Sequence, residues 1–208
     1  MLYSIVKRCL DIIIAALALI FGFPLFLFVS FAIWIEDRGR VIYTQKRVGK
    51  DREPFKIYKF RSMVENADEI LFSNPELYEK MRSGSHKVKD DPRITEVGKF
   101  IRKYSIDEFP QFLNVLKGEM SFVGPRAYRP DELEKCECDM SSRAEQFEHI
   151  LSVKPGITGL WQVSGRSNLS FTERLDLEET YALSKSLLLD LSIILKTPIA
   201  VLKAEGAV

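Results

Sequence analysis

Residues 12–35 read IIIAALALIFGFPLFLFVSFAIWI, a run of 24 residues without a charged side chain. As one continuous helix this run would be about 36 Å long, compared with about 30 Å for the hydrocarbon core of a bilayer. It is too long for the apolar part of a signal peptide, and no small-residue cleavage site follows it. The sequence therefore predicts that this segment enters a membrane.

The middle and the flanks of the run indicate how it enters. Pro24 follows Gly22 at the centre, where a proline removes a backbone donor and clashes with the preceding turn. Lys7 and Arg8 precede the run and further basic residues follow it, so the positive-inside rule places both flanks in the cytoplasm. A re-entrant helix–break–helix satisfies both flanks and is favoured over the alternative, a proline-kinked helix that spans the bilayer. Asp11 lies one helical turn from Lys7 and is expected to pair with it at the interface.

The totals bound the rest of the chain. Its 208 residues are enough for one domain with a core and an appendage, which we divide into the membrane helix, residues 1–38, and a cytosolic domain, residues 39–208. The 30 basic and 29 acidic residues leave a net charge of +1, which gives no support to nucleic-acid binding. Three cysteines, an odd number, do not form a disulfide framework.

The cytosolic domain reads as an α+β fold with a small sheet. Residues 40–60 alternate apolar and polar side chains on either side of Gly49-Lys50-Asp51, which predicts a hairpin. Helices are expected over residues 63–81 with an interruption at Ser73-Asn74-Pro75, and over residues 97–104, 131–151 and 171–183. We expect a mobile polar loop over residues 83–91, a turn over residues 154–159 and a strand over residues 160–163. The apolar segment 187–202, broken at Pro198, is expected to lie in the membrane interface; the alternative is packing in the core.

The candidate chemistry concentrates in RKYSIDEFPQ, residues 102–111, and GEMSFVGPR, residues 118–126. Asp107 and Glu108 are adjacent, and neighbouring carboxylates disfavour each other's ionisation unless a cation lies between them. Oxygen ligands suit Mg²⁺, so this pair is a predicted metal site. Arg102 upstream and Arg126 downstream match phosphate geometry and complete the outline of a phosphoryl-transfer site. The alternative is a solvated Asp-Glu pair on a surface helix.

The residues before the pair resemble a helix start. Ser105 is followed three residues later by Glu108, as in a capping box. This spacing predicts that a helix running to Leu116 carries both carboxylates in its first turn, where free backbone N–H groups and the helix dipole favour anions.

Several short motifs, each weak alone, become specific when they occur in one order. They are Lys7-Arg8 with Asp11; the apolar run interrupted at Pro24; Gln45, Arg47 and Gly49; Phe55-Lys56 with Lys59-Phe60-Arg61; Asp91-Pro92-Arg93-Ile94-Thr95; Asp107-Glu108 with Pro110-Gln111; Asn114-Val115 with Lys117-Gly118; Val123-Gly124-Pro125-Arg126; Pro155-Gly156-Ile157-Thr158-Gly159; Gly165-Arg166; and Gly206-Ala207. In this combination the chain resembles the monotopic phosphoglycosyl transferases, the bacterial sugar transferases also called polyprenol-phosphate glycosyl-1-phosphate transferases.

The likeness covers nearly the whole chain, with two departures. Phe23-Pro24 stands where the family often has Ser-Pro, so a hydroxyl at the break is missing, and residues 64–90 are longer than in the smallest relatives. The resemblance leads us to expect a minimal form without the large amino-terminal membrane domain of longer members. It also implies a membrane-associated α/β fold with a re-entrant helix and in-plane amphipathic helices.

The resemblance further implies an activity and its partners. A sugar 1-phosphate would pass from a UDP-sugar to undecaprenyl phosphate, with release of UMP, at the inner leaflet of the bacterial cytoplasmic membrane. Asp107 would be the nucleophile and carry a covalent phosphosugar in a ping-pong reaction, with Mg²⁺ on Asp107 and Glu108. The sequence around Trp161 and the carboxy-terminal tail are similar to those of members that use hexose 1-phosphates. Association into a homodimer is left open.

The diphosphate of the donor is anionic, so cationic side chains are expected to bind it. Arg102, Arg126 and Arg166 are the expected partners of the phosphate oxygens and of the leaving UMP, and Lys59 and Gly124 complete the predicted phosphate-binding set. Arg102 could instead pair with a helix carboxylate, and Lys59 could be structural.

Two other functions stay open at this point. A membrane-tethered, Mg²⁺-dependent phosphohydrolase of nucleotide-sugars could use the same aspartate. A non-catalytic membrane partner could keep the fold, although the intact Asp107, Glu108 and arginines argue against it.

Overall fold

The computed structural model describes residues 2–83, 91–139 and 143–203 of the chain. It is a mixed, helix-rich structure with small sheets, in agreement with the predicted α+β class. The strands are β1 (Ile42–Val48), β2 (Pro54–Phe60), β3 (Ser121–Val123) and β4 (Gly156–Thr158). The α-helices are α1 (Leu2–Asp37), α2 (Ala67–Ser73), α3 (Pro75–Ser83), α4 (Glu96–Lys103), α5 (Phe112–Lys117), α6 (Pro130–Asp139), α7 (Ala144–Leu151), α8 (Leu160–Ser164), α9 (Phe171–Ser184) and α10 (Leu187–Lys203); the 3₁₀ helices are η1 (Lys50–Arg52), η2 (Ile106–Gln111) and η4 (Arg166–Asn168).

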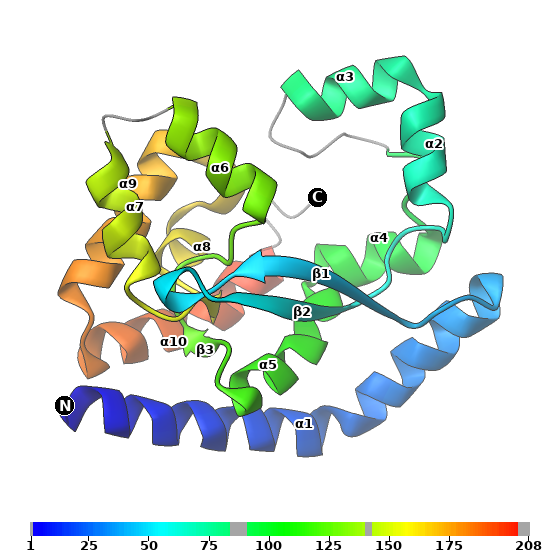
Figure 1. Ribbon diagram of the computed structural model, residues 1–208. Coiled ribbons are helices and arrows are strands. Elements are labelled where there is room, and N and C mark those ends of the chain that lie inside the picture. The colour runs from blue at the N-terminus through cyan, green and yellow to red at the C-terminus, as the bar shows by residue number, and fades with distance from the viewer. Residues whose placement is uncertain (1, 84–90, 140–142, 204–208) are drawn as a thin grey trace.

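The predicted membrane segment forms α1, a helix of 36 residues that runs along the bottom of the molecule in Figure 1. Pro24 lies inside this helix, which changes direction near its middle instead of ending there (Figure 1). The predicted break at Pro24 is therefore corrected to a bend. A proline disturbs only the turn before it, and a helix can continue beyond that turn at an angle.

The amino-terminal half of α1 is fixed by polar contacts. Arg8 donates to two carbonyl oxygens at the end of α5, at 2.6 and 2.9 Å. Asp11 accepts from the Ser121 hydroxyl at 3.0 Å and from the following backbone N–H at 2.9 Å. Lys7 donates to Asp190 of α10 at 3.0 Å. The predicted Lys7–Asp11 pair is therefore wrong, because each side chain finds its partner far along the chain.

The carboxy-terminal half of α1 is held by a different part of the same body. Val29 and Ile33 are buried in a cluster with residues of β2 and α4. Glu36 accepts from the first N–H of α4 at 2.8 Å, and Asp37 forms an ion pair with Arg61 at the end of β2. Both ends of α1 thus contact one folded unit.

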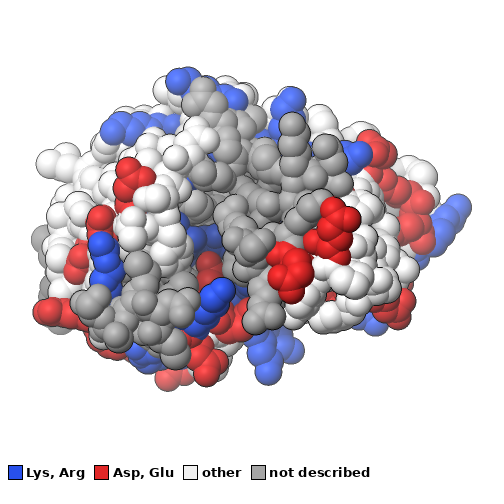
Figure 2. Space-filling model, turned by 90° about the horizontal axis from the view of Figure 1, so that it is seen from above, with Lys and Arg blue, Asp and Glu red and all other residues white. Residues whose placement is uncertain are grey.

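The outer surface of α1 is nevertheless apolar and exposed. Four of its residues are buried, and most of its large side chains between Leu10 and Ile35 lie on the surface. In the part of the chain that the structure describes, α1 is the one helix long and apolar enough to cross a membrane. The opposite face of the molecule differs, because basic and acidic side chains are interspersed there (Figure 2). The two faces therefore suit different surroundings.

The predicted hairpin over residues 40–60 is confirmed as the antiparallel pair β1–β2. Phe55, Ile57 and Phe60 of β2 point into the core. Asn114 of α5 covers the outer edge of β2, because its side chain accepts from the Tyr58 N–H at 3.1 Å and donates to the Lys56 carbonyl at 2.7 Å. The hairpin is therefore joined to the helix that follows the candidate site.

A second, parallel pair joins β3 to β4. Gly124 and Gly156 allow this approach, because a Cβ on Gly124 would lie 2.4 Å from the Lys154 carbonyl and one on Gly156 would lie 2.1 Å from the Gly124 nitrogen. The prediction of a turn over residues 154–159 missed this strand. The predicted strand at residues 160–163 is also wrong, since these residues begin α8. A segment of four residues is too short to distinguish the helical period from the strand period.

The carboxy-terminal part is helical as expected. The predicted helix over residues 171–183 is confirmed as α9, which begins with a capping box between Ser170 and Glu173. The predicted break at Pro198 is wrong, because α10 continues through it to Lys203. The predicted helix over residues 97–104 is confirmed as α4, where Thr95 accepts from Gly98 N–H at 2.9 Å. Most of the loop predicted over residues 83–91, and the Gly206-Ala207 motif, lie outside the described residues.

Candidate active site

Asp107 and Glu108 lie on η2, the short 3₁₀ helix between α4 and α5. Ser105, the residue before η2, has φ 56° and ψ 23°, and its side chain makes no capping hydrogen bond. The predicted capping box is therefore wrong, because a capping side chain needs an extended backbone at this position. The expected single helix to Leu116 is instead η2, with Pro110 inside it, followed by α5.

Lys59 of β2 joins the two carboxylates. Its Nζ lies 2.6 Å from Glu108 Oε1 and 3.7 Å from Asp107 Oδ2. The Asp107 side chain is 12% exposed, and that of Glu108 is 34% exposed. The cation that adjacent carboxylates require is thus present here as an ammonium group of the chain itself.

The pKa values of the two carboxyl groups shift in opposite directions. Burial, with the neighbouring Glu108 charge, raises the pKa of Asp107 to about 6 despite the opposing charges of Lys59 and Arg102. Burial also opposes the Glu108 charge. The charge and hydrogen bond of Lys59, helped by Arg126 and Arg47, outweigh burial there and lower the pKa of Glu108. At neutral pH both are ionised, and Asp107 is the stronger base.

The three predicted arginines act on this pair from different elements. Arg102, in the last turn of α4, favours the Asp107 charge, whereas Arg126, after β3, favours the Glu108 charge. Burial lowers the pKa of Arg166 while Glu108 opposes that shift, so Arg166 also feels the pair. Its φ of 51° lies in the left-handed region. The structure therefore brings these arginines and Lys59 into the field of the two carboxylates.

The other predicted site residues lie elsewhere. Gly124 is buried between β3 and β4, and its N–H donates to the Thr158 carbonyl at 2.8 Å. Lys7, Arg8 and Asp11 join α1 to the body, as described above. Pro24 is exposed on α1.

Sequence reasoning missed a buried network behind the arginines. Glu132 lies 3.9 Å from Arg47 Nη1, 4.0 Å from Arg126 Nη2 and 3.8 Å from Arg174 Nη1. Arg174 also pairs with Glu178 at 3.0 Å, and both are buried. Glu132 and Glu178 fall in ordinary charged helices whose sequence gives no signal of burial. The sequence placed Arg47 in a motif and among the basic residues after the membrane segment, but gave it no role in the site.

Phe109 connects the site to the membrane helix. It follows Glu108 directly, and a Cβ added to Gly22 of α1 would lie 2.3 Å from the Phe109 ring. The absence of a side chain at Gly22 therefore lets η2 rest on the middle of α1, near Pro24.

The carboxylates fit one kind of divalent-metal site. Among the described residues no group of three or more His, Cys, Asp or Glu side chains could hold a metal. Mg²⁺, however, is commonly held by one or two carboxylates together with phosphate oxygens and water. Glu108, partly exposed and ionised, suits such a role when a diphosphate supplies the remaining oxygens.

Comparisons with known proteins identify the family to which the chain belongs. The sequence pattern described as "Bacterial sugar transferase" matches residues 2–204. The exopolysaccharide production protein ExoY of Sinorhizobium fredii is 45% identical, over 98% of this chain and 88% of its own length. The undecaprenyl-phosphate galactose phosphotransferase of Salmonella typhimurium is 42% identical, over 97% of this chain and 41% of its own length. The UDP-glucose:undecaprenyl-phosphate glucose-1-phosphate transferase of Klebsiella pneumoniae is 38% identical, over 92% of this chain and 39% of its own length. Because one pattern spans nearly all the described residues, the chain belongs to the bacterial sugar transferase family.

Proposed function

We propose that the protein transfers a sugar 1-phosphate from a UDP-sugar to undecaprenyl phosphate and releases UMP. The observation that carries the proposal is a buried Asp107 of raised pKa beside an ionised Glu108–Lys59 pair, with arginines around both. The names of the Salmonella and Klebsiella relatives support the acceptor and a hexose phosphate as the group transferred. The ExoY name supports a place in exopolysaccharide production.

The reaction divides into two transfers at one phosphorus atom. An oxygen of Asp107 attacks the phosphorus that carries the sugar, the bond from that phosphorus to the bridging oxygen breaks, and UMP leaves with the bridging oxygen. An oxygen of the lipid phosphate then attacks the same phosphorus and frees the Asp107 carboxylate. A carboxylate whose pKa is about 6 is ionised at neutral pH yet more basic than an ordinary aspartate, which suits a nucleophile.

The cations around Asp107 offset the electrostatic repulsion between its carboxylate and the diphosphate. Lys59 lies between the two carboxylates, and Arg102 acts on Asp107. Arg126 and Arg166 act on Glu108 and are suited to the leaving phosphate. When bound by Glu108 and the diphosphate oxygens, Mg²⁺ would supply further neutralisation of charge.

Contacts of α1 support a re-entrant position at the inner leaflet. A straight helix of its 36 residues would be about 54 Å long, and a spanning arrangement would place its ends on opposite sides of the bilayer. Instead Arg8 near one end and Glu36 near the other contact the same folded body. The bend near Pro24 allows both ends to stay on the cytoplasmic side, with the exposed apolar surface in lipid. Such a position would put η2, which rests on Gly22, at the membrane surface.

The test is a UMP-release assay with a panel of UDP-sugars, with and without undecaprenyl phosphate. We expect glycolipid product with acceptor, and with donor alone a stoichiometric burst of UMP and a mass increase on the protein equal to one phosphosugar. Continuous release of sugar phosphate into water without lipid product would favour the hydrolase instead.

The pH dependence reports the acidity of Asp107. Because the ionised carboxylate is required, kcat/KM for the donor should fall about tenfold per pH unit below pH 6 and level off above it. The donor diphosphate does not titrate in this range, so the acidic limb of the profile, the fall in kcat/KM below pH 6, reports a group of the enzyme. Lys59→Met removes a cation that opposes protonation and should move the limb to higher pH. The matched variant Lys56→Met, on the exposed face of the same strand, should leave it in place. A limb near pH 4 in the unmodified protein would contradict the burial argument.

Removal of divalent metal tests the role given to Glu108. EDTA is expected to slow UMP release by on the order of 10²-fold or more, with recovery on addition of Mg²⁺, since metal charge stabilisation contributes several kcal/mol in such reactions. In Glu108→Gln, the Mg²⁺ concentration for half-maximal rate should rise. Unchanged activity in EDTA would remove the metal from the proposal.

A further inference from the structure

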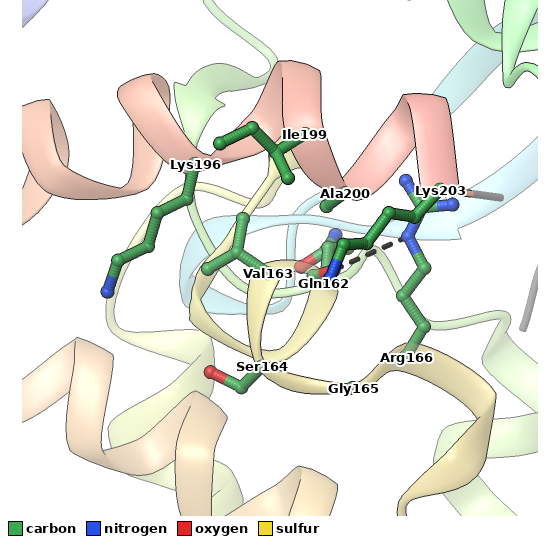
Figure 3. A pocket seen from close by; sticks show the side chains of 9 residues that line it. All are labelled: Gln162, Val163, Ser164, Gly165, Arg166, Lys196, Ile199, Ala200 and Lys203. Atoms are coloured by element: carbon green, nitrogen blue, oxygen red, sulfur yellow. Dashed lines mark hydrogen bonds between the residues drawn. The ribbon is translucent and has the colours of Figure 1, made fainter. Parts of the chain in front are cut away.

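A pocket lies beside the candidate active site, between the α8–η4 segment and α10. Its volume is about 270 Å³, and its lining includes Arg166, Lys196 and Lys203 together with Gln162, Val163 and Ile199. In Figure 3, Arg166 and Lys203 reach toward one end of the pocket, while Lys196 stands toward the other.

The charge of the pocket points to an anion. Three of its lining side chains are cationic and none is a carboxylate. Within the described ranges, no carboxylate forms an ion pair with Lys196 or Lys203, although ion pairs are frequent elsewhere on the surface. Arg166 is half-buried, so its charge acts in a less polar setting than that of the two lysines. A phosphate matches such a set of donors.

Helix α10, which forms one wall of the pocket, indicates that the ligand also has an apolar part. Ile199 is 58% exposed, and it continues a row of exposed side chains on the same face of α10: Leu188, Leu191, Leu195 and Leu202. Their spacing of three and four residues makes one stripe along the helix. A ligand that fits both features has an anionic head and a long apolar tail. A nucleotide would use the cations but leave the stripe uncovered.

Two contacts relate the pocket to the rest of the proposed machinery. The charge of Arg166, which lines the pocket, also interacts with the charge of Glu108. Asp190 of α10 accepts from Lys7 and Tyr3 of α1, each at 3.0 Å, so the leucine stripe and the apolar surface of α1 belong to adjoining helices. A lipid that lies along α10 would thus stay in the same layer as α1.

From these observations we propose that the pocket seats the phosphate of the acceptor lipid, with the isoprenoid tail along the exposed leucines of α10. The assignment rests on the proposed function, which it extends by naming where the second substrate binds. Lys196 and Lys203 are binding residues in it, and Arg166 stands between the bound lipid phosphate and the carboxylate pair.

The test compares two double variants that remove the same charge. Lys196→Gln/Lys203→Gln changes the pocket, whereas Lys135→Gln/Lys185→Gln changes exposed lysines outside the lining. Binding of undecaprenyl phosphate is measured directly in neutral detergent micelles without donor. The KM values for acceptor and for UDP-sugar are then measured in the same micelles. Co-sedimentation with neutral and with anionic phospholipid vesicles measures attachment to a bulk membrane surface.

We expect the pocket variant to bind undecaprenyl phosphate about 100-fold more weakly and its KM for this lipid to rise accordingly, because each of the two lost charge-assisted contacts corresponds to about tenfold. The KM for UDP-sugar, donor-only loading and vesicle attachment should match those of the control. Unchanged lipid affinity would overturn the proposal, as would a rise confined to the donor KM, which indicates a nucleotide pocket. Lost attachment to anionic vesicles with normal acceptor binding would assign the lysines to bulk phospholipid and also overturn it. An unmodified protein that binds the lipid but turns over no UDP-sugar would refute the proposed function and leave the pocket assignment supported.

Discussion

Asp107→Asn is expected to abolish UMP release and at the same time to stabilise the folded protein. Asparagine keeps the shape of the side chain but cannot form the acyl phosphate, so the rate should fall by about 10⁴-fold or more. The gain in stability follows from burial, which raises the pKa of Asp107 from its ordinary value of 3.8 to about 6. The stability associated with a raised pKa is fully present below the ordinary pKa and is lost as pH rises through the folded value. At pH 8 the unmodified protein has lost it, on the order of 1–3 kcal/mol.

Thermal unfolding at pH 8 and pH 5 measures this effect. The melting temperature of Asp107→Asn should exceed that of the unmodified protein at pH 8, and the difference should shrink at pH 5. Glu108→Gln is the matched control with the opposite sign, because Lys59 lowers the pKa of Glu108 and the folded state favours its charge. If Asp107→Asn turned over at a rate comparable to that of the unmodified protein, the assignment of Asp107 as the nucleophile would be wrong. A lower melting temperature for this variant at pH 8 would contradict the burial argument.

Arg174→Met should cause the largest loss of stability among single side-chain changes in the arginine network. Arg174 is buried, and it pairs with Glu178 at 3.0 Å. Its guanidinium also lies over the Tyr128 and Trp161 rings, 4.9 and 4.8 Å from their centroids. Methionine fills part of the space but leaves Glu178 as a buried charge without its ion-pair partner, a change that typically costs about 3–5 kcal/mol. For a chain of this size that corresponds to a fall in melting temperature of about 10 °C.

Two further variants separate the lost charge from lost packing. Arg174→Met/Glu178→Gln removes both charges and should recover part of the loss. Lys99→Met breaks an exposed pair with Glu96 and should change the free energy of unfolding by about 0.5 kcal/mol or less. An equally small change for Arg174→Met would show that water reaches the network.

This network also explains why the site and the stability of the fold are linked. Glu178 accepts from the Arg126 N–H at 3.4 Å, and Glu132 lies within 4.0 Å of both Arg47 and Arg126. These arginines favour the Glu108 charge. Buried carboxylates on α6 and α9 therefore hold cations that face the candidate active site.

Local patterns determined much of what the sequence predicted. The apolar run, the hairpin, the start of α4 at Thr95 and the course of α9 follow from composition, alternation and capping over a few residues. The candidate site at Asp107, Glu108 and the arginines was also visible in the sequence, because adjacent carboxylates with flanking cations are a local signal. The wrong predictions concern short segments, such as residues 160–163 and the Ser105 cap, where neighbours from elsewhere outweigh local preference.

Long-range contacts decided the rest. Sequence could indicate that a cation must balance Asp107 and Glu108, but only folding brings Lys59, 49 residues before Glu108, to 2.6 Å from its carboxylate. Lys7 and Asp190 are 183 residues apart and still form an ion pair. Burial of Glu132 and Glu178 likewise depends on which helices pack against α6 and α9. The sequence by itself thus determined the long apolar segment, the types of most longer elements and the candidate reactive groups. The tertiary structure decided the partners and the acidity of those groups, because charge interactions depend on distance and burial, which neighbours in sequence do not set.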